Sequence, residues 1–302
     1  MVNGYLNYMG SKYKLLDQIL PEMDYSKSQF IDLFTGSFVV GANVVDKYDK
    51  VIANDIIKEL IGIHKGVLES DDIIDKTKLL CPEKDDTKSF LELRESFNKE
   101  KSPDKLWALI LSCNSNMMRF NKSLLFNQTH GKRTWNDSTT KKVNEFINLI
   151  RPYREKISFI SGHFKDVKVD RPSMVYIDSP YTGSEAGYNS YWNKEDDDIL
   201  YEYCKYLDIN GSSFMLSGIL GEHKPGVRWK LIDKLISDGY KYNSSNNSQS
   251  VFFSAGLFQD KSIWKLNFLL GHQQNDMAWL GVSDSLIRID RRTNANSTQE
   301  KD

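Results

Sequence analysis

Hydrophobic positions at both ends of the chain alternate between strand-like runs and helix-like spacing. The pattern near the N-terminus predicts a strand, a turn, a helix and a strand in the segments FIDLF, TGSF, VVGANVVDKY and KVIAND. Together they span about thirty residues, the size of a βαβ unit. A further helix follows in IIKELIGIHKGVL. The second half predicts strands in KISFI, SMVYID, SSFMLS, YKYN and SIWKLNFLL, and helices in EDDDILYEYCKYL and VRWKLIDKLISDG. Such alternation indicates a mostly parallel sheet with helices on both faces.

The middle of the chain has a different pattern. Residues 71–113 show helical spacing interrupted by Pro82 and by Ser102-Pro103, and they carry no strand signal. Residues 112–140 are polar, rich in Asn, Thr and Lys, and have little periodicity. After residue 271 the chain turns polar again and ends in RRTNANSTQEKD, a composition typical of a disordered tail. The pattern therefore predicts an α/β sheet interrupted by a mainly helical insertion.

The composition changes this picture little. Of the 302 residues 40% are hydrophobic and 27% charged, and the net charge is −1, so any nucleic-acid surface has to be local. Three cysteines, far apart and without a C-x-x-C pair, favour a reducing compartment over a disulfide framework or a zinc cluster. No apolar run approaches the roughly 18 residues of a membrane span, and the N-terminus lacks a signal-peptide core. We expect a soluble cytoplasmic protein.

Three predicted strands end in polar or small residues, in DLFTG, AND and IDSPY. Ligands bind at the carboxyl ends of parallel strands, so these residues predict a site. Asp55 follows Gly36 by 19 residues, close to the ~20 that separate a glycine turn from the acidic residue that accepts ribose hydroxyls. The alternative for Asp55 is a helix N-cap. TGSFVVG lacks both G-x-G-x-x-G and a phosphate-loop Lys-Ser/Thr pair, which favours a nucleoside ligand without a pyrophosphate.

The tetrapeptide DSPY, at the end of the buried-looking run MVYI, suits the activation of an aromatic amine. The adenine amino nitrogen is a poor nucleophile until hydrogen-bond acceptors localise its lone pair. Asp178 and the carbonyl of Ser179 can accept both amino protons, while Pro180 fixes the backbone that aims this carbonyl. Tyr181 offers a flat face for an extruded base. The alternative is an ordinary turn, since D-S-P-Y is good turn chemistry.

The order of several motifs resembles the Dam-type DNA adenine-N6 methyltransferases (class alpha, D12-like), including those encoded by phages. The motifs are YMGSK, FIDLFTGS, VIANDI, SNMMRFN, GKRT, HFKDV and DSPY, followed by YN and W and by SIWKLNF. The resemblance covers roughly residues 5 to 270, and its specificity lies in the ordered set. It implies a Rossmann-like S-adenosylmethionine-dependent methyltransferase sheet with an inserted, mainly helical target-recognition domain. The implied parts are a catalytic domain in residues 1–57 and 157–270, a target-recognition domain in 58–156 and a polar tail in 271–302.

The resemblance also implies roles for individual residues. Lys12 would meet the methionine carboxylate of S-adenosylmethionine, Asp55 the ribose hydroxyls and Asp166 the adenine amino group. The implied cofactor-binding residues are Tyr8, Gly10, Lys12, Asp32, Phe34, Gly36, Asp55, Ile56, Phe164, Asp166 and Asp178. The implied catalytic residues are Asp178, Ser179, Pro180 and Tyr181. Without the family, Lys12 reads as a solvated helix residue, Asp166 as a turn residue and Phe164 as core. The methyl transfer to adenine N6 would be direct, with neither a metal nor a covalent enzyme intermediate.

A local excess of basic residues suits a phosphate-binding face, and the resemblance implies that its partner is double-stranded DNA. Residues 118–156 hold nine basic and three acidic residues, a balance of about +6. The resemblance places Arg119 and Arg133 where the family reads guanines, and Lys122 and Lys132 are expected to contact phosphates. The alternative is a solvated helix face. We expect a monomer that acts on one adenine at a time.

Three departures from the family pattern leave the target sequence open. Ser179 replaces the usual proline, Asn114 stands where relatives often carry a wedging aromatic, and Thr129-His130 replaces a proline-aromatic pair. The target could be GATC, a relaxed form of it or another site. Two alternatives also stay open: an enzyme that methylates RNA or another polymer, and a methyltransferase-like protein that binds DNA without activity.

Overall fold

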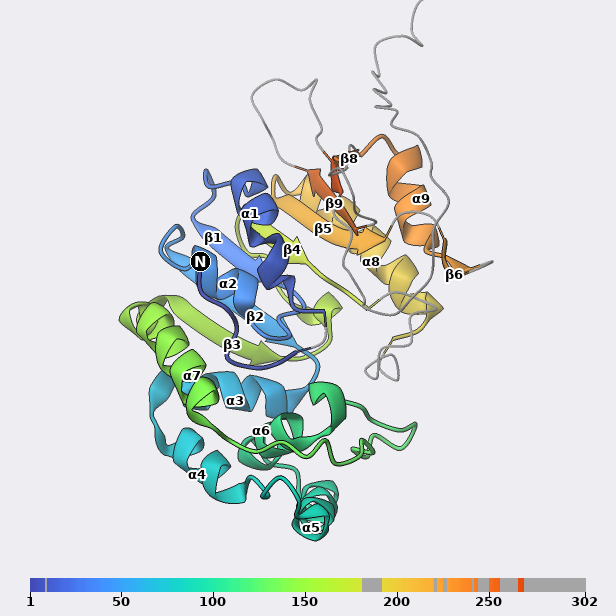
Figure 1. Cartoon of the computed structure of the whole chain (residues 1–302). Coiled ribbons are helices and arrows are strands. Elements are labelled where there is room, and N and C mark those ends of the chain that lie inside the picture. The colour runs from blue at the N-terminus through green and yellow to red at the C-terminus, as the bar shows by residue number, and fades with distance from the viewer. Residues whose placement is uncertain are drawn as a thin grey trace, which may run out of the picture.

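The structure is a computed structural model, which describes residues 1–8, 10–180, 192–219, 222–224, 227–240, 242–243, 250–255 and 266–268 (Figure 1). Its parallel strands are β1 (Gln29–Asp32), β2 (Lys50–Asp55), β3 (Ile157–Ser161), β4 (Met174–Ile177) and β5 (Ser213–Ile219). The antiparallel strands of the same sheet are β8 (Tyr242–Asn243), β9 (Ser250–Ala255) and β10 (Leu266–Phe268). The strand order β10-β9-β5-β4-β1-β2-β3 is that of an open, doubly wound sheet with antiparallel strands added at one edge.

Helices cover both faces of this sheet. The α-helices of the first half are α1 (Leu16–Ile19), α2 (Val39–Val44), α3 (Lys58–Glu69), α4 (Asp72–Leu80), α5 (Thr87–Lys99) and α6 (Pro103–Ser112). Those that follow are α7 (Asp137–Ile150), α8 (Lys194–Ile209) and α9 (Lys230–Ser237). The 3₁₀ turns are η1 (Lys12–Leu15), η2 (Leu20–Glu22), η3 (Asn114–Asn116), η4 (Arg151–Lys156) and η5 (Phe164–Asp166). Figure 1 shows α1, α2, α3 and α7 on one side of the sheet and α8 and α9 on the other.

The period of two along each strand creates two separate hydrophobic cores. In β4, Met174 and Tyr176 belong to the core under α1 to α7, whereas Val175 and Ile177 belong to the core under α8 and α9. In β5, Met215 faces the first core and Leu216 the second. Strands buried on both faces have continuous apolar sequences, which is why the central parallel strands β1 and β4 were recognisable in the sequence.

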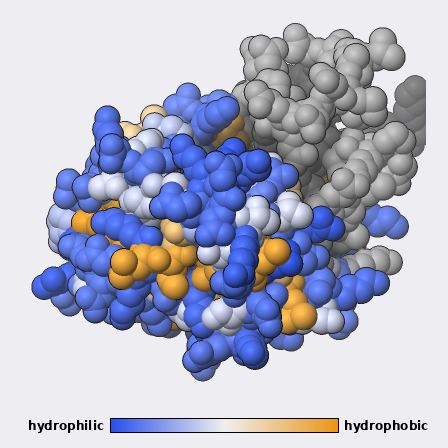
Figure 2. Space-filling view, turned by 60° about the horizontal axis from the view of Figure 1, so that its bottom comes forward, coloured by the Kyte–Doolittle hydropathy of each residue, from blue (hydrophilic) through white to orange (hydrophobic). Residues whose placement is uncertain are grey.

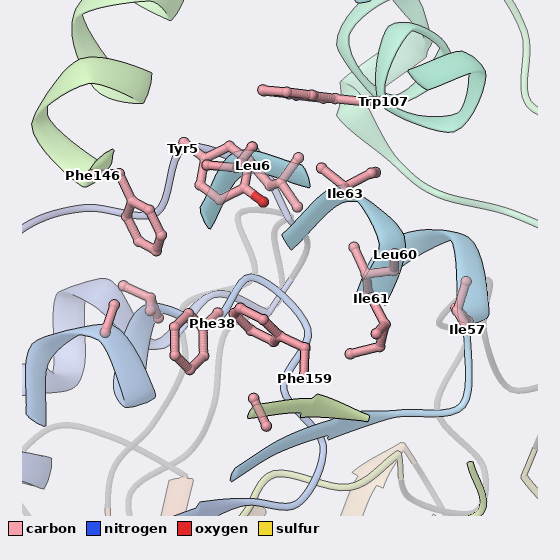
Figure 3. Packing of buried hydrophobic residues seen from close by; sticks show 14 of the residues in the cluster. Tyr5, Leu6, Phe38, Ile57, Leu60, Ile61, Ile63, Trp107, Phe146 and Phe159 are labelled. Carbon is pink, nitrogen blue, oxygen red and sulfur yellow. The ribbon is translucent and has the colours of Figure 1, made fainter. Parts of the chain in front are cut away.

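The first core continues from the sheet into the helical middle of the chain. Tyr5, from the N-terminal segment, is buried between Trp107 of α6 and Phe146 of α7, with ring centroids 5.2 and 4.8 Å away (Figure 3). Phe38 packs edge-on against Phe159 of β3 at 4.8 Å. The helices therefore share a core with the sheet, and the division into catalytic and target-recognition domains stays a prediction. Figure 2 shows that the outer side of this helical part is mostly hydrophilic, with small hydrophobic areas.

The α/β architecture predicted from the pattern is confirmed, with two differences in detail. The helix expected from Val227 begins only at Lys230, because Val227–Arg228 form β7, which pairs with β6 (Glu222–Lys224). Strand β9 was not predicted: its apolar run is only VFF, and it becomes a strand by antiparallel pairing with β5. The tail after residue 271 lies outside the described residues. No helix in the described part of the chain is both long and apolar enough to traverse a membrane.

Candidate functional site

The candidate site lies where the strand order reverses. Strand β1 pairs with β2 on one side and with β4 on the other, so the chain turns away in opposite directions from this point. Asp32 closes β1, Asp55 closes β2, and Asp178 directly follows β4. The carboxyl ends of these three parallel strands share one edge of the sheet, which is where ligands bind in doubly wound folds. The structure thus places three predicted carboxylates at the switch point.

Lys12 and Asp178, 166 residues apart in the sequence, form an ion pair at this edge. Lys12 is the first residue of η1, and its ammonium also donates to the carbonyl of Gly10 at 3.0 Å. Gly10 has a φ of +83°, which a glycine adopts without strain. The other carboxylate oxygen of Asp178 accepts a 2.6 Å hydrogen bond from the hydroxyl of Ser217 in β5. Both oxygens of Asp178 are therefore oriented by donors from distant segments.

The glycine loop after β1 is held from two sides. Gly36 has a φ of +47°, and its amide donates to Asp55 Oδ2 at 3.1 Å. Its carbonyl lies 2.8 Å from Nε2 of His64 in α3, whose Nδ1 lies 2.7 Å from the hydroxyl of Tyr5. A carbonyl only accepts, so Nε2 carries the proton and Nδ1 accepts from Tyr5. Tyr8 packs against Gly36 so closely that an added Cβ would lie 3.0 Å from its ring.

Asp55 is a buried carboxylate, 8% exposed, that organises the end of β2. Its Oδ1 accepts from the amide of Ile57 at 3.0 Å, but it does not cap α3, because the residue before this helix is Ile57. Burial raises the pKa of Asp55 to about 6, against the opposing effect of the backbone amides. The next residue, Ile56, leaves 40% of its surface exposed. A carboxylate beside an uncovered apolar side chain suits a ligand with both polar and flat apolar parts.

Asp32 lies deepest of the three carboxylates, at 2% exposure. Burial raises the pKa of Asp32 well above its ordinary value, and the negative charge of Asp178 acts in the same direction. The amide of Gly41 in α2 donates to it at 3.3 Å and partly offsets this effect. The carboxylate of Asp32 is therefore held by a backbone amide of α2 at the buried end of β1.

An aromatic cluster links the ends of β1 and β3. The ring of Phe34 lies 5.3 Å from Phe164 and 5.6 Å from Trp192, the residue before the cap of α8. Phe164 is buried in the second core, whereas Asp166 is exposed in the same 3₁₀ turn. Phe164 is thus both a core residue and a neighbour of Phe34. No contact in the described part of the chain ties Asp166 to the three carboxylates at the strand ends.

The remainder of the tetrapeptide is described only in part. Ser179 is buried and Pro180 half-buried directly after Asp178. The expected base-stacking residue, Tyr181, lies outside the described residues, so its predicted role remains untested. The described residues hold no group of three His, Cys, Asp or Glu side chains arranged for a metal ion.

The predicted DNA-binding residues lie on a hairpin-like connection between α6 and α7. Isolated bridges pair Cys113 with His130 and Phe120 with Phe126. The exposed basic residues on or beside this hairpin are Arg119, Lys122, Lys132 and Arg133. In Figure 1 this connection, in green, extends toward the same side of the molecule as the arrowheads of β3 and β5. The basic residues are thus separate from the carboxylates but lie on a segment that extends toward the same side.

Helix α5 holds the returning half of this hairpin. The side-chain amide of Asn98 both donates to the carbonyl of Phe126 at 3.0 Å and accepts from its amide at 2.8 Å. Arg94 donates to the carbonyl of Gln128 at 3.1 Å. His130, one of the departures from the family pattern, stacks on Phe90 with ring centroids 4.9 Å apart. The hairpin therefore has a fixed position relative to α5.

The local excess of basic residues does not form one continuous free face. Arg151 donates to the carbonyl of Val67 and to Asp71, so it holds the end of α3. Arg133 contacts the side chain of Asn116, and the ammonium of Lys132 lies 3.9 Å from Asp85. The charge count therefore overstated the free basic surface at Arg151, whereas Lys132 and Arg133 remain exposed to solvent.

Three residues at the site were not identified from the sequence. Ser217 stands in LSG at the end of a predicted strand, so the rule that pointed to Asp178 could have found it. Tyr5 and His64 carried no comparable signal, because a lone tyrosine or histidine within an apolar pattern is usually part of the core. Their partnership with Gly36 exists only in three dimensions.

The sheet order and the carboxylates at its switch point define a Rossmann-like α/β protein. A profile of the D12 class N6 adenine-specific DNA methyltransferases matches residues 8–250. This match covers most of the chain, and the chain belongs to that family.

Several characterised relatives are similar over most of this chain. The type II methyltransferase M.FokI of Planomicrobium okeanokoites is 29% identical, with 79% of this chain and 38% of the relative covered. The modification methylase StsI of Streptococcus sanguinis is 30% identical, with coverages of 81% and 41%. The DNA adenine methylase of Serratia marcescens is 29% identical, with coverages of 62% and 69%. The chain therefore spans about two fifths of the length of the first two relatives.

Among solved structures, a proposed rRNA methylase from Clostridium thermocellum aligns with a TM-score of 0.38 and 11% identity. The alignment covers 80% of this chain and 94% of that chain. Similarity at this level carries no information about the substrate of the present protein.

Proposed function

We propose that this protein is a site-specific DNA methyltransferase that transfers a methyl group from S-adenosylmethionine to adenine N6 of an extruded base. Besides membership of the family, one observation supports this proposal. Lys12, Asp55 and Asp178, which belong to three distant motifs, meet at the switch-point edge of the sheet. Ion pairing of Lys12 with Asp178 supports a single site rather than two separate ones.

The residues at this edge fit S-adenosylmethionine in chemical type. Two buried hydroxyls next to the proposed binding residues, those of Ser11 and Ser179, have no hydrogen-bond partner among the described residues. Unpartnered buried polar groups are costly and are commonly satisfied by a ligand or a water molecule. Lys12 would bind the methionine carboxylate, Asp55 the ribose hydroxyls and Ile56 the adenine ring. Phe164 and Asp166 complete the proposed adenine subsite.

Asp178 acts on the target adenine through hydrogen bonding. Its carboxylate and the carbonyl of Ser179 accept the two amino protons, so that the nitrogen lone pair becomes available as the nitrogen turns tetrahedral. S-adenosylmethionine supplies an activated methyl group on a sulfonium centre. The amine loses its proton only after it has become cationic, so Asp178 need not be a strong base. The protein contributes orientation and preorganised acceptors, and no metal ion is required for the transfer.

Double-stranded DNA would bind across the hairpin that α5 holds. Arg119 and Arg133 are the proposed readers of guanine edges, and Lys122 and Lys132 the phosphate contacts. A bidentate arginine–guanine pair contributes about 1–3 kcal/mol of discrimination. The proposed enzyme acts as a monomer in the cytoplasm. Its target sequence is GATC or a related site.

The test is methyl incorporation into unmethylated duplex DNA from a tritiated donor, with long-read sequencing to locate the modified adenines. Wild-type protein should label DNA at one short sequence. Asp178→Ala should abolish labelling while S-adenosylhomocysteine binding, measured by calorimetry, stays within about tenfold, because Asp178 is proposed to act mainly on the base. Near-normal turnover by Asp178→Ala would remove the catalytic assignment. Labelling of RNA but not DNA would favour the RNA-methyltransferase alternative.

A further inference from the structure

Ser217 lies beside Asp178 because of the register between β4 and β5. The two strands are parallel, and Ile177 pairs with Leu216, so the next residue pair is Asp178 with Ser217. Side chains alternate between the two faces of a sheet. Asp178 therefore follows Tyr176 to the side of the first core, and Ser217 follows Met215 to the same side. The backbone alone places the hydroxyl next to the carboxylate.

The hydrogen bond between the two side chains is well formed and sheltered. Ser217 is 2% exposed, and its hydroxyl donates to Asp178 Oδ1 at 2.6 Å, a length typical of a hydroxyl bound to a carboxylate. The hydroxyl of Tyr176, two residues before Asp178 on the same strand, is buried beside the hydroxyl of Ser217. Ser217 is therefore the donor by which the sheet itself holds Asp178.

We propose that Ser217 is a positioning residue for the methyl-transfer reaction, which fixes the carboxylate plane of Asp178 toward the adenine amino group. This inference rests on the proposed function. Lys12, the partner of the other oxygen, sits on a short 3₁₀ turn outside the sheet and has a second task at the cofactor carboxylate. Ser217 lies on β5, which pairs with β4 on one side and with β9 on the other, and its hydroxyl donates a hydrogen bond to Asp178. It is the contact that keeps Asp178 oriented while Lys12 binds the cofactor.

The experiment measures single-turnover methyl transfer together with steady-state kcat and KM on unmethylated duplex DNA. Ser217→Ala should lower the single-turnover rate and kcat by about 10- to 100-fold, as expected when a preorganised group loses its orientation. The KM values for DNA and for S-adenosylmethionine should stay within about threefold of wild type. Ser217→Thr, which keeps the hydroxyl, should recover most of the lost rate.

Ser213→Ala is the matched control. Ser213 lies four residues earlier on the same strand, is equally buried, and donates its hydroxyl to a different carboxylate, Asp24. This variant should lose stability without the selective loss of kcat. A second readout does not depend on turnover: with S-adenosylhomocysteine bound, wild-type protein should prefer a duplex with adenine over one with purine, which lacks the amino group, at the target position. Ser217→Ala should reduce this preference.

The outcomes separate the two proposals. A wild-type enzyme that methylates DNA, with Ser217→Ala unchanged in rate and in preference for the amino group, overturns the role of Ser217 alone. Equal rate losses in Ser217→Ala and Ser213→Ala would assign the effect to general destabilisation of β5 and would also overturn it. A wild-type protein that neither methylates DNA nor discriminates adenine from purine overturns the proposed function, and the role of Ser217 with it.

Discussion

Replacing His64 with glutamine should remove a large part of the acid sensitivity of this fold. His64 is 1% exposed, and its ring stacks on Phe159 with centroids 5.3 Å apart. Its two nitrogens bond to Tyr5 and to the carbonyl of Gly36. Because only Nε2 needs a proton in this arrangement, a glutamine can supply one donor and one acceptor without a titrating group. At neutral pH the variant should therefore stay folded.

The magnitude follows from the pKa of His64. Burial lowers this pKa from the ordinary value of 6.5 to about 4 in the folded protein. Below pH 6.5 this histidine is protonated in the unfolded chain but stays neutral in the folded protein. The free energy of unfolding therefore decreases as the pH falls from 6.5 toward 4. Between pH 7.5 and pH 5 these two values correspond to a loss of about 2 kcal/mol. Asp55 acts in the opposite direction, because its folded-state pKa is raised, but it is present in both proteins and cancels in their difference.

The assay is urea denaturation followed by fluorescence and circular dichroism at pH 7.5 and pH 5, for wild type, His64→Gln and His130→Gln. Wild type should lose about 2 kcal/mol more than His64→Gln on acidification. His130→Gln should behave as wild type, because it leaves His64 and its two partners unchanged. Parallel losses in wild type and His64→Gln would refute the assignment of a neutral, buried imidazole beneath the glycine loop.

Three further changes probe the loop, the ion pair and the hairpin. Gly36→Ala places a Cβ 3.0 Å from the ring of Tyr8 on a backbone with φ +47°. The left-handed conformation costs an alanine about 1 kcal/mol or more, so S-adenosylhomocysteine binding should weaken about tenfold in calorimetry. Unchanged affinity would show that this loop does not contribute to cofactor binding. Lys12→Met should weaken the same affinity at least about tenfold, because a charged hydrogen bond contributes roughly 1.5–3 kcal/mol, whereas unaltered binding would exclude Lys12 from the cofactor site. Asn98→Ala removes both hydrogen bonds to Phe126. It should weaken duplex binding, measured by fluorescence anisotropy, about tenfold and leave cofactor affinity unchanged. Loss of both affinities together would indicate a folding defect instead.

The local pattern of the sequence was enough to predict the α/β architecture. The central parallel strands β1 and β4 are buried on both faces, so their sequences are short continuous runs, FID and MVYI, followed by polar residues. Position at the carboxyl end of such a strand pointed to Asp55 and Asp178 before any tertiary contact was known. These features depend on residues that are close together in the chain. They can therefore be predicted from the sequence without knowledge of the fold.

Tertiary structure decided the features that join distant segments. The ion pair of Lys12 with Asp178 spans 166 residues, and the bond from Tyr5 to His64 spans 59. Strand β9 owes its place to pairing with β5, and the hairpin owes its position to Asn98 on another element. No local period encodes such contacts, because the partners are brought together only by the order of strands in the sheet and by the packing of helices on it. The position of Asp178 at a strand end could be anticipated from its motif, but the donors that orient it could not.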